Sequence, residues 1–177
     1  NPESNFVRTL FHTSDGRWLA GTNRGLFVYD SSAARWNVVG DLSRNIIYSL
    51  AEDPGGRLLV GSASGFYVGP RLGSTSVESM SFNRLEAGSG SVDSVGSIRS
   101  ITNFKGAVYI ASYGRGVERF ADNRLTNLWT QNETLPRDIT AVAADGDTRL
   151  LIGTAKSGVI VFDGQSLDRD GQFEALG

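Results

Sequence analysis

Short apolar runs separated by polar turns recur four times along the chain. The clearest stretch reads "DGRWLAGTNRGLFVYD" at 15–30, and related stretches lie at 55–69, 105–120 and 147–163. Each stretch has an apolar run, a turn that ends in glycine, and a second apolar run. The runs are rich in Val, Ile, Leu, Phe and Tyr and bounded by Gly, Asp, Asn and Ser. This pattern predicts β-strands rather than helices.

The four stretches align on a pair of small residues that closes the first apolar run. The pairs are Gly21-Thr22, Gly61-Ser62, Ala111-Ser112 and Gly153-Thr154, with spacings of 40, 50 and 42 residues. An apolar segment further upstream aligns as well, and its equivalent positions are Leu10, Leu50, Ile101 and Val142. Self-similarity at this period predicts a solenoid or a propeller.

Two kinds of turn are expected inside each repeat. "SDGR", "PGGR", "FKGA" and "DGDT" follow the first strand, where Asp-Gly and Gly-Gly suit tight hairpins with positive φ. "TNRG", "SASG", "SYGRG" and "TAKSG" follow the second strand, and their closing glycine permits a left-handed residue. A fourth, more polar strand is expected at 35–40, 81–88, 124–130 and 172–177. Four antiparallel strands per repeat of this length make a propeller blade.

The sequence therefore predicts an all-β fold, a single β-propeller segment over residues 1–177 with four four-stranded antiparallel blades. The blades are expected at about 5–40, 45–88, 96–132 and 137–177. We expect the four upstream positions above to be buried, together with Leu19, Leu59, Val108 and Leu151. Each blade would use its own repeat, so an open arc would leave apolar faces on the first and last blades. We therefore expect self-association into a larger ring, or further blades in a longer parent chain.

The repeat resembles that of the two-component regulator propeller family. The resemblance lies in the Asp-Gly, apolar-Trp, Gly-Thr and Gly-Leu-aromatic order of 15–30, with departures at Val68-Gly69 and Ala111-Ser112. It implies an extracytoplasmic sensor domain, periplasmic or extracellular, of a bacterial hybrid signalling protein that responds to glycans. Ser14 to Trp18 also resembles the Asp-box of sialidase-like propellers, but it lacks the intervening residues, and no other repeat combines Ser, Asp and Trp.

The composition indicates which kinds of partner the chain is not expected to bind. The 177 residues include 17 basic and 19 acidic ones, for a net charge of −2, so nucleic acid is not an expected partner. No stretch is apolar over the roughly 20 residues of a membrane helix, and no signal peptide is visible, so we expect no direct membrane contact. The chain begins at Asn1, which suggests a mature form or an excised segment. It has no cysteine and one histidine, so we expect no metal and no cofactor.

Candidate catalytic residues do not form a pattern. His12 ends a predicted strand, without the orienting acid and nucleophile that a general base requires. Asp15, Asp53 and Asp145 recur at the first hairpins, where Asp is favoured because its side chain bonds the turn backbone. The irregular segment "EAGSGSVDSVGS" at 86–97 has no strand-then-helix context for phosphate binding, although a loop of this size can carry other ligands. The sequence therefore predicts a protein without enzymatic activity.

Positively charged residues give a clearer indication of a binding site than the candidate catalytic residues do. The turns after the second strands, and the connections between blades, are expected at one end of the propeller. Together they carry Arg24, Arg44, Tyr113, Arg115, Arg137 and Lys156. Arginine pairs with carboxylates in a bidentate manner, and an aromatic ring can stack on the apolar face of a sugar. These six residues are the predicted site for a small-molecule or oligosaccharide ligand, an acidic saccharide in particular, although Arg and Lys are also common in exposed turns.

Three functions remain open on the sequence alone. The first is a non-catalytic, ligand-sensing propeller. The second is a scaffold that binds a protein, either another chain or a second copy of itself. The third is a fragment of a sialidase- or lyase-like enzyme, which the missing catalytic cluster disfavours.

Overall fold

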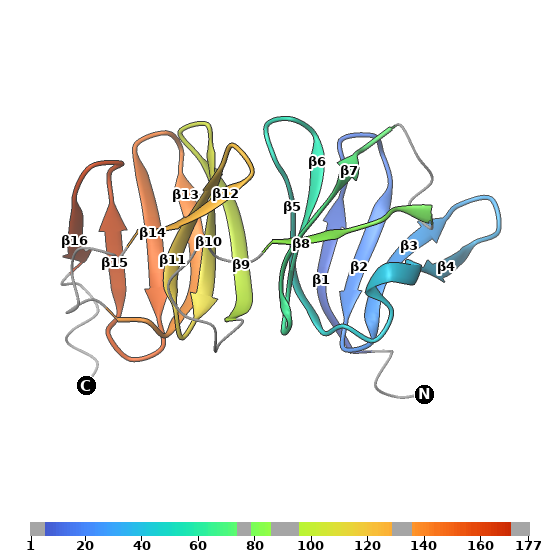
Figure 1. Ribbon diagram of the computed structural model, residues 1–177, viewed down its shortest axis with the longest axis horizontal. Helices are drawn as coiled ribbons and strands as arrows, with labels where there is room; N and C mark the ends of the chain where they lie inside the picture. The colour runs from blue at the N-terminus through green and yellow to red at the C-terminus, as the bar shows by residue number, and fades with distance from the viewer. Residues whose placement is uncertain (1–5, 74–78, 86–95, 129–135, 171–177) are drawn as a thin grey trace. The chain divides into compact units, whose positions relative to one another are not determined.

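The computed structural model describes residues 6–73, 79–85, 96–128 and 136–170. Its strands form four four-stranded antiparallel sheets, here called blades 1 to 4, which confirms the predicted architecture (Figure 1). Blade 1 contains β1 (Val7–His12), β2 (Trp18–Thr22), β3 (Gly25–Asp30) and β4 (Arg35–Val38). Blade 2 contains β5 (Ile47–Glu52), β6 (Arg57–Ser62), β7 (Gly65–Arg71) and β8 (Asn83–Leu85).

The second half of the chain repeats this order. Blade 3 contains β9 (Ser97–Phe104), β10 (Ala107–Tyr113), β11 (Gly116–Ala121) and β12 (Arg124–Asn127). Blade 4 contains β13 (Ile139–Asp145), β14 (Arg149–Thr154), β15 (Val159–Phe162) and β16 (Leu167–Asp170). The fourth strand of blade 4 is therefore β16 and not the predicted segment 172–177, which lies outside the described residues.

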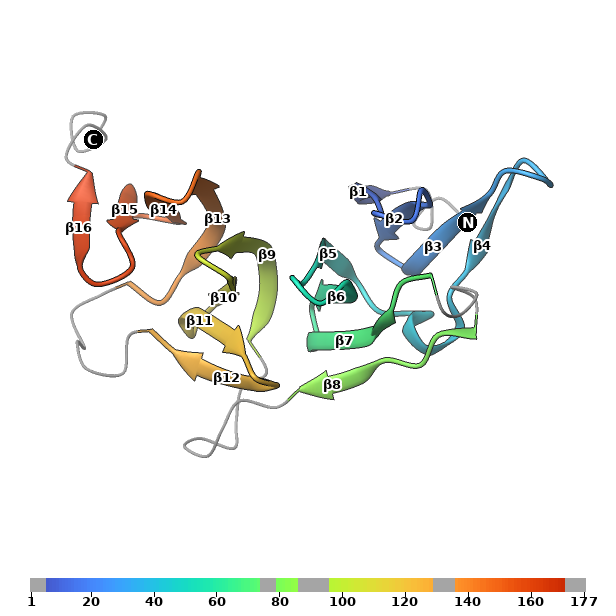
Figure 2. The same cartoon turned by 90° about the horizontal axis from the view of Figure 1, so that it is seen from above.

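The chain divides into two compact units, Asn1–Glu86 with blades 1 and 2, and Ala87–Gly177 with blades 3 and 4. Within the first unit β1 lies beside β5, and within the second β9 lies beside β13 (Figure 2). A hydrophobic core fills the space between the two blades of each unit. In the first unit it includes Leu19, Leu26 and Val28 of blade 1 with Ile47, Leu50 and Leu58 of blade 2.

The glycine turns follow the prediction. Gly16 and Gly56 in the first hairpins have φ of +87° and +77°. Gly25 and Gly65, which close the turns after the second strands, have φ of +127° and +131°. Residues that carry a Cβ atom are strained at such positive φ angles, so these positions favour glycine.

The predicted core is confirmed in part. Leu10, Leu50, Ile101 and Val142 pair with equivalent residues of their second strands, as the alignment requires. Leu50 and Val142 are buried, but Ile101 is only half-buried and Leu10 is 59% exposed, so its predicted burial was wrong. The cause is that Leu10 lies on the side of blade 1 that faces away from blade 2.

The second core set needs two corrections. Leu19, Leu59 and Val108 are buried, whereas Leu151 is only half-buried because it faces away from blade 3. Val108 is also not the equivalent of the other three. Tyr109 holds that register, since it pairs with the residue that follows Ile101.

Helical structure is slight. A 3-10 helix, η2 (Gly40–Leu42), lies in the connection between blades 1 and 2. No helix within the described residues has the length and apolar character needed to cross a membrane.

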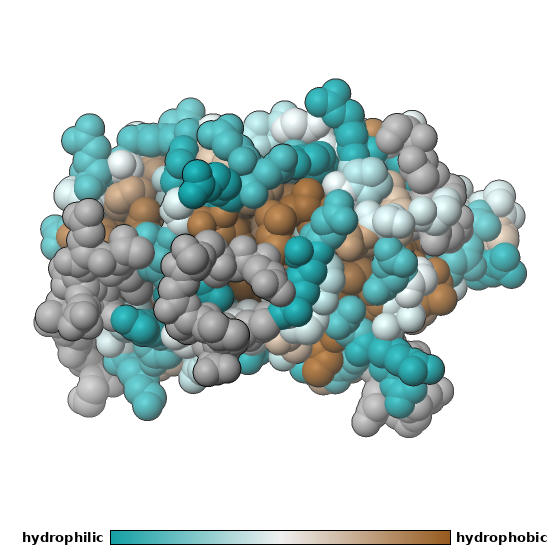
Figure 3. Space-filling model, in the orientation of Figure 1, coloured by the Kyte–Doolittle hydropathy of each residue, from teal (hydrophilic) through white to brown (hydrophobic). Residues whose placement is uncertain are grey.

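On the face drawn in Figure 3, apolar side chains reach the surface between polar ones, so apolar burial is incomplete.

Candidate ligand-binding site

A buried hydroxyl organises the turn after the second strand of a blade. The Thr22 hydroxyl donates to the Gly25 carbonyl over 3.0 Å and accepts from the Arg24 N–H over 3.0 Å. The same two bonds are made by Ser62 with Gly65 and Ser64, and by Thr154 with Gly158 and Ser157. This explains the hydroxyl residue that follows the small residue in blades 1, 2 and 4, whereas the equivalent Ser112 hydroxyl of blade 3 is buried and makes neither bond. We call the end of the strands that carries these turns the turn end.

The described parts of the connections within each unit lie at the turn end, as predicted. In the first unit the Arg44 N–H donates to the Arg24 carbonyl over 3.1 Å. A bond of 2.9 Å also joins the Ala63 N–H, in the turn of blade 2, to the Ile46 carbonyl. Arg24 and Arg44 are thus backbone neighbours, and both side chains are exposed.

The second unit brings four predicted residues together. The Arg137 carbonyl accepts from the N–H groups of Gly114 and Gly116, which flank Arg115, over 2.8 and 3.2 Å. Tyr113 forms a β-bridge with Asp138, and the Asp138 carbonyl accepts from Ala155, the residue before Lys156. Arg137 and Lys156 are exposed, and Tyr113 is 46% exposed.

Arg115 has a partner that sequence reasoning missed. Its guanidinium donates to the buried Glu118 carboxylate over 2.9 Å. Burial raises the pKa of Glu118, while the charge of Arg115 and the nearby Ser112 hydroxyl act in the opposite direction. Arg115 therefore neutralises a buried charge, which limits how freely it can serve a ligand.

A second set of missed residues occupies β-bulges. In the first strand of every blade one extra residue interrupts the pairing with the second strand. These residues are Arg8, Tyr48, Arg99 and Thr140. A bulge bends its strand and re-aims the side chain, and bulges often lie beside functional sites. A polar or aromatic residue after Val7, Ile47, Ile98 and Ile139 in all four repeats was the available signal.

Three of these bulge residues, Arg8, Tyr48 and Arg99, take part in contacts between a guanidinium and an aromatic ring at the turn end. The Arg8 guanidinium lies 4.9 Å from the ring centroids of both Phe6 and Tyr48, and its Nε–H donates to Asn23 in the turn of blade 1. In the second unit the Arg99 guanidinium lies 5.6 Å from the ring centroid of Tyr113. Each unit thus combines exposed cations with an aromatic ring at the turn end, which is suited to an anionic ligand with an apolar face.

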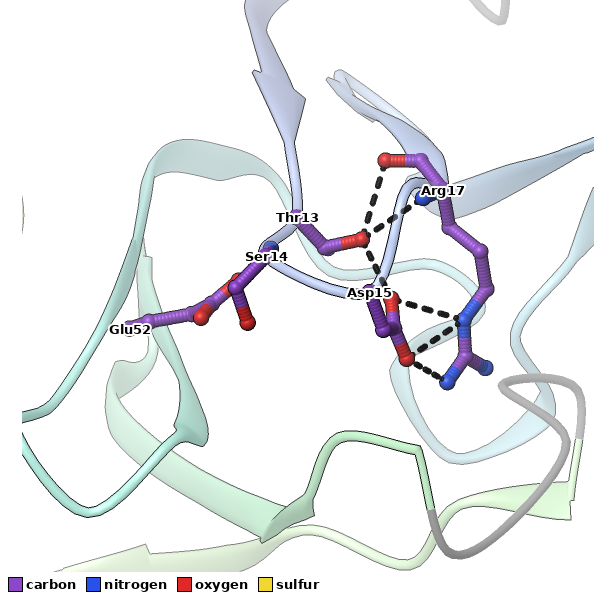
Figure 4. Close-up of polar contacts among 5 residues, drawn as sticks. All are labelled: Thr13, Ser14, Asp15, Arg17 and Glu52. Atoms are coloured by element: carbon purple, nitrogen blue, oxygen red, sulfur yellow. Dashed lines mark hydrogen bonds and ion pairs between the residues drawn. The ribbon is translucent and has the colours of Figure 1, made fainter.

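The opposite end of the strands carries structural pairs instead. In blade 1 the Thr13 hydroxyl donates to Asp15, whose carboxylate also pairs with Arg17 (Figure 4). The hydrogen bond from Arg17 is the main cause that lowers the pKa of Asp15 to about 2. The Ser14 N–H donates to Glu52 at the end of β5, which ties this hairpin to blade 2 (Figure 4).

The other predicted carboxylates act in the same way. Asp53 accepts from the backbone and side chain of Arg57, and Asp145 pairs with Arg149 across its hairpin. Asp53 and Asp145 hold equivalent positions, but Thr13 rather than Asp15 is their counterpart in blade 1. Hairpin bonding therefore accounts for these carboxylates, as the sequence suggested.

The remaining catalytic candidates are isolated. His12 ends β1, where its ring lies 4.6 Å from that of Trp18. Within the part of the chain that the structure describes, no three His, Cys, Asp or Glu side chains gather as a metal site would need. Residues 86–95 of the predicted irregular segment lie outside the described residues.

Comparison with known proteins identifies the fold. No protein-family model matches the chain, and no curated protein matches it. Among solved structures, it resembles the extracellular domain of a B. thetaiotaomicron protein designated hybrid two-component system BT4673, with TM-score 0.74 and 17% identity over 94% of this chain. The corresponding domain of BT3049 from the same organism gives the same values, and an ancestral GH74 enzyme gives TM-score 0.63 and 14% identity over 91% of this chain.

These likenesses show that the chain is built of β-propeller blades. The chain spans 24% of the BT4673 domain, 23% of the BT3049 domain and 24% of the GH74 enzyme. The same fold therefore occurs in extracellular domains of signalling proteins and in an enzyme, and the function of this chain must come from its own residues.

Proposed function

We propose that the chain is a non-catalytic, ligand-sensing propeller segment of an extracytoplasmic sensor, of the two-component regulator propeller type, and that its ligand is an acidic saccharide. The observation that carries the proposal is the gathering of exposed cations and aromatic rings at the turn end of each unit. The exposed Arg8, Arg24 and Arg44 contribute to the first unit. The exposed Arg137 and Lys156 and the half-buried Arg99 contribute to the second. The likeness to extracellular domains of two-component systems supports the sensor role and the location outside the cytoplasm.

Chemistry also favours an acidic sugar over a neutral one. Arginine and lysine supply charge-assisted hydrogen bonds to carboxylate or sulfate, while Phe6, Tyr48 and Tyr113 offer apolar ring faces. The carboxylates at the opposite end are held in hairpin pairs with arginine. They are therefore poorly placed to act as the acid and base of a glycosidase.

Isothermal titration calorimetry on the full 177-residue chain tests this proposal. The ligands are a uronic-acid oligosaccharide, a sulfated oligosaccharide and a neutral glucan of equal length. We expect at least one acidic ligand to bind, the neutral one to bind weakly or not at all, and binding to weaken with added salt. Arg8→Ala should raise the Kd of a ligand that binds the first unit by about tenfold or more, and Arg137→Ala that of a ligand that binds the second, because a hydrogen bond to a charged group contributes about 1.5–3 kcal/mol.

Arg124→Ala is the matched control, since Arg124 is an exposed arginine at the start of β12, directly after the turn from β11. Arg115 is avoided because its loss would leave Glu118 buried and unpaired. Absence of binding by both acidic ligands would refute the proposal. An equal loss with Arg124→Ala and Arg137→Ala would also refute it, and a scaffold role would then be the better account.

A further inference from the structure

Blade 1 exposes an apolar face on the side away from blade 2. Seven large apolar or aromatic side chains are exposed among the described residues, and five of them lie on this face. They are Val7, Leu10, Trp18, Trp36 and Val38, which are 44–59% exposed. The strand register places all five on one side, since Leu10, Ala20, Phe27 and Val38 pair in a row across the sheet. We call it the open face of blade 1.

The equivalent face of blade 2 is covered. Ile47, Leu50 and Leu58 hold the register positions of Val7, Leu10 and Trp18, and all three are buried in the core between blades 1 and 2. The same positions are therefore buried in blade 2, against blade 1, and exposed in blade 1, where no described residue covers them. The open face of blade 1 has the composition of an interface between blades.

Blade 4 has the complementary side exposed. Ala141 and Ala143 are exposed, and Leu151, Gly153, Val159 and Val161 are half-buried, on the side away from blade 3. We call these six residues the open face of blade 4. Their register counterparts in blade 1 include Leu19, Gly21 and Val28, which pack against blade 2.

A glycine in the second strand leaves space for a side chain of the next blade. A Cβ added to Gly21 would lie 2.7 Å from Cγ2 of Ile47 in blade 2, so a side chain there would collide with the neighbouring blade. At the equivalent Gly153 an added Cβ would meet no atom nearer than Cβ of Ala141, at 3.5 Å, which is ordinary contact. Blade 4 therefore keeps the equivalent of the slot that Ile47 occupies beside Gly21, and no residue in the described ranges occupies it. The register counterpart of Ile47 in blade 1 is Val7.

We propose that the open face of blade 4 docks onto the open face of blade 1 of a second copy of this chain, with Val7 of that copy entering the slot at Gly153. The two surfaces are the two halves of a contact that the chain already makes between blades 1 and 2. A contact between different faces of identical chains is heterologous, and it closes into a ring when the rotation permits. This proposal is independent of the ligand.

Light scattering coupled to gel filtration tests the docking on the full chain at micromolar concentrations. We expect the parent chain to associate. Leu10→Asp on blade 1 and Val161→Asp on blade 4 should each raise the midpoint concentration of association at least about tenfold, because either one introduces a charge into the contact. Ser31→Asp, in the exposed turn between β3 and β4, adds the same charge elsewhere and should leave the mass unchanged.

Mixing the two variants gives the sharpest result. Each variant retains one intact face, so an equimolar mixture should form a 1:1 complex although neither variant associates alone. If the open face of blade 1 instead bound the same face of a second copy, Val161→Asp would associate as the parent chain does. That outcome, or a parent chain that stays monomeric, would overturn the proposal.

Filling the slot gives a second test that does not depend on charge. Gly153 has no positive φ and no close neighbour, so Gly153→Val should leave the unfolding midpoint of the dilute chain unchanged. It should nevertheless abolish association, whereas Gly40→Val, also at an uncrowded glycine, should not. Association that survives Gly153→Val would show that the slot is not the docking point.

Discussion

Single side chains fix the geometry of both kinds of turn. At the turn end Thr22 satisfies one donor and one acceptor of its turn from a buried position. At the opposite end Asp15 and Arg17 close the first hairpin with help from the Thr13 hydroxyl. Because unpaired buried polar groups are costly, these bonds hold the turns in one conformation. These bonded turns carry cations of the candidate site, such as Arg24.

The Asp15 pair should give the chain a measurable acid sensitivity. The folded state holds the pKa of Asp15 at about 2, below its usual 3.8, so the pair stabilises the fold above pH 4 and loses this effect as the pH falls toward 2. Asp15→Asn should therefore lower the free energy of unfolding at pH 6 by no more than about 1 kcal/mol, since water screens the pair, and by only a small part of that near pH 2.

Chemical denaturation of both proteins at pH 6 and pH 2 checks this expectation. Asp122→Asn, in an exposed turn of blade 3, is the control for removing a carboxylate. A difference between parent and Asp15→Asn that stays constant over this pH range would contradict the ionic role of Asp15.

Some residue features could be predicted from the sequence and others could not. The positive φ of Gly16 and Gly25 was predictable, because Gly recurs at turn positions that demand it. Arg8 and Tyr48 were missed because strict strand alternation assigns them no special position, and the bulge is visible only from the pairing. Glu118 was missed because a single acidic residue in an apolar strand gives no hint that Arg115 lies beside it.

At the scale of the element, a blade has two different faces and is buried only where it has a neighbour. Leu50 and Leu10 occupy the same repeat position, yet they are 7% and 59% exposed. The sequence predicted them alike because a repeat carries no mark of whether a neighbour is present. Their substitutions should therefore differ in cost.

Leu50→Ala should lower the free energy of unfolding by about 2–5 kcal/mol, because it leaves a cavity in the core between blades 1 and 2. Leu10→Ala should change it by less than about 0.5 kcal/mol in the dilute chain, where its face is open. Urea denaturation of both variants at low protein concentration measures the two values. Equal losses would show that blade 1 and blade 2 are packed differently from this description.

The outermost strands were the hardest elements to place from the sequence. Blade 4 uses β16 (Leu167–Asp170), although the more apolar segment 172–177 was predicted. An edge strand pairs on one side only and packs on little apolar surface, so its hydrophobic pattern is weak. The inner strand β10 was predictable because residues 107–111 form a continuous apolar run, and all of them are buried.

At the scale of the whole chain, the fourfold repeat was sufficient to predict an all-β propeller fold. The candidate site could be predicted only in part. Repeat spacing placed Arg24, Arg44 and Arg137 at the turn end, where hydrogen bonds join their segments. The bulge residues that complete the site required the strand register. The proposed ligand class is inferred from the positive charges and the aromatic ring faces of the site.

Hydrogen–deuterium exchange with a uronic-acid oligosaccharide, against a neutral glucan as control, tests the central claim that ligand binds at the turn end. We predict slower exchange in segments 22–25 and 44–48 of the first unit or 113–116 and 137–140 of the second, with no change at hairpins 13–17, 53–57 and 145–149. Bound ligand occludes the backbone groups beneath it, so protection maps its location directly. Protection confined to the hairpins, or none at saturating acidic oligosaccharide, would contradict this account.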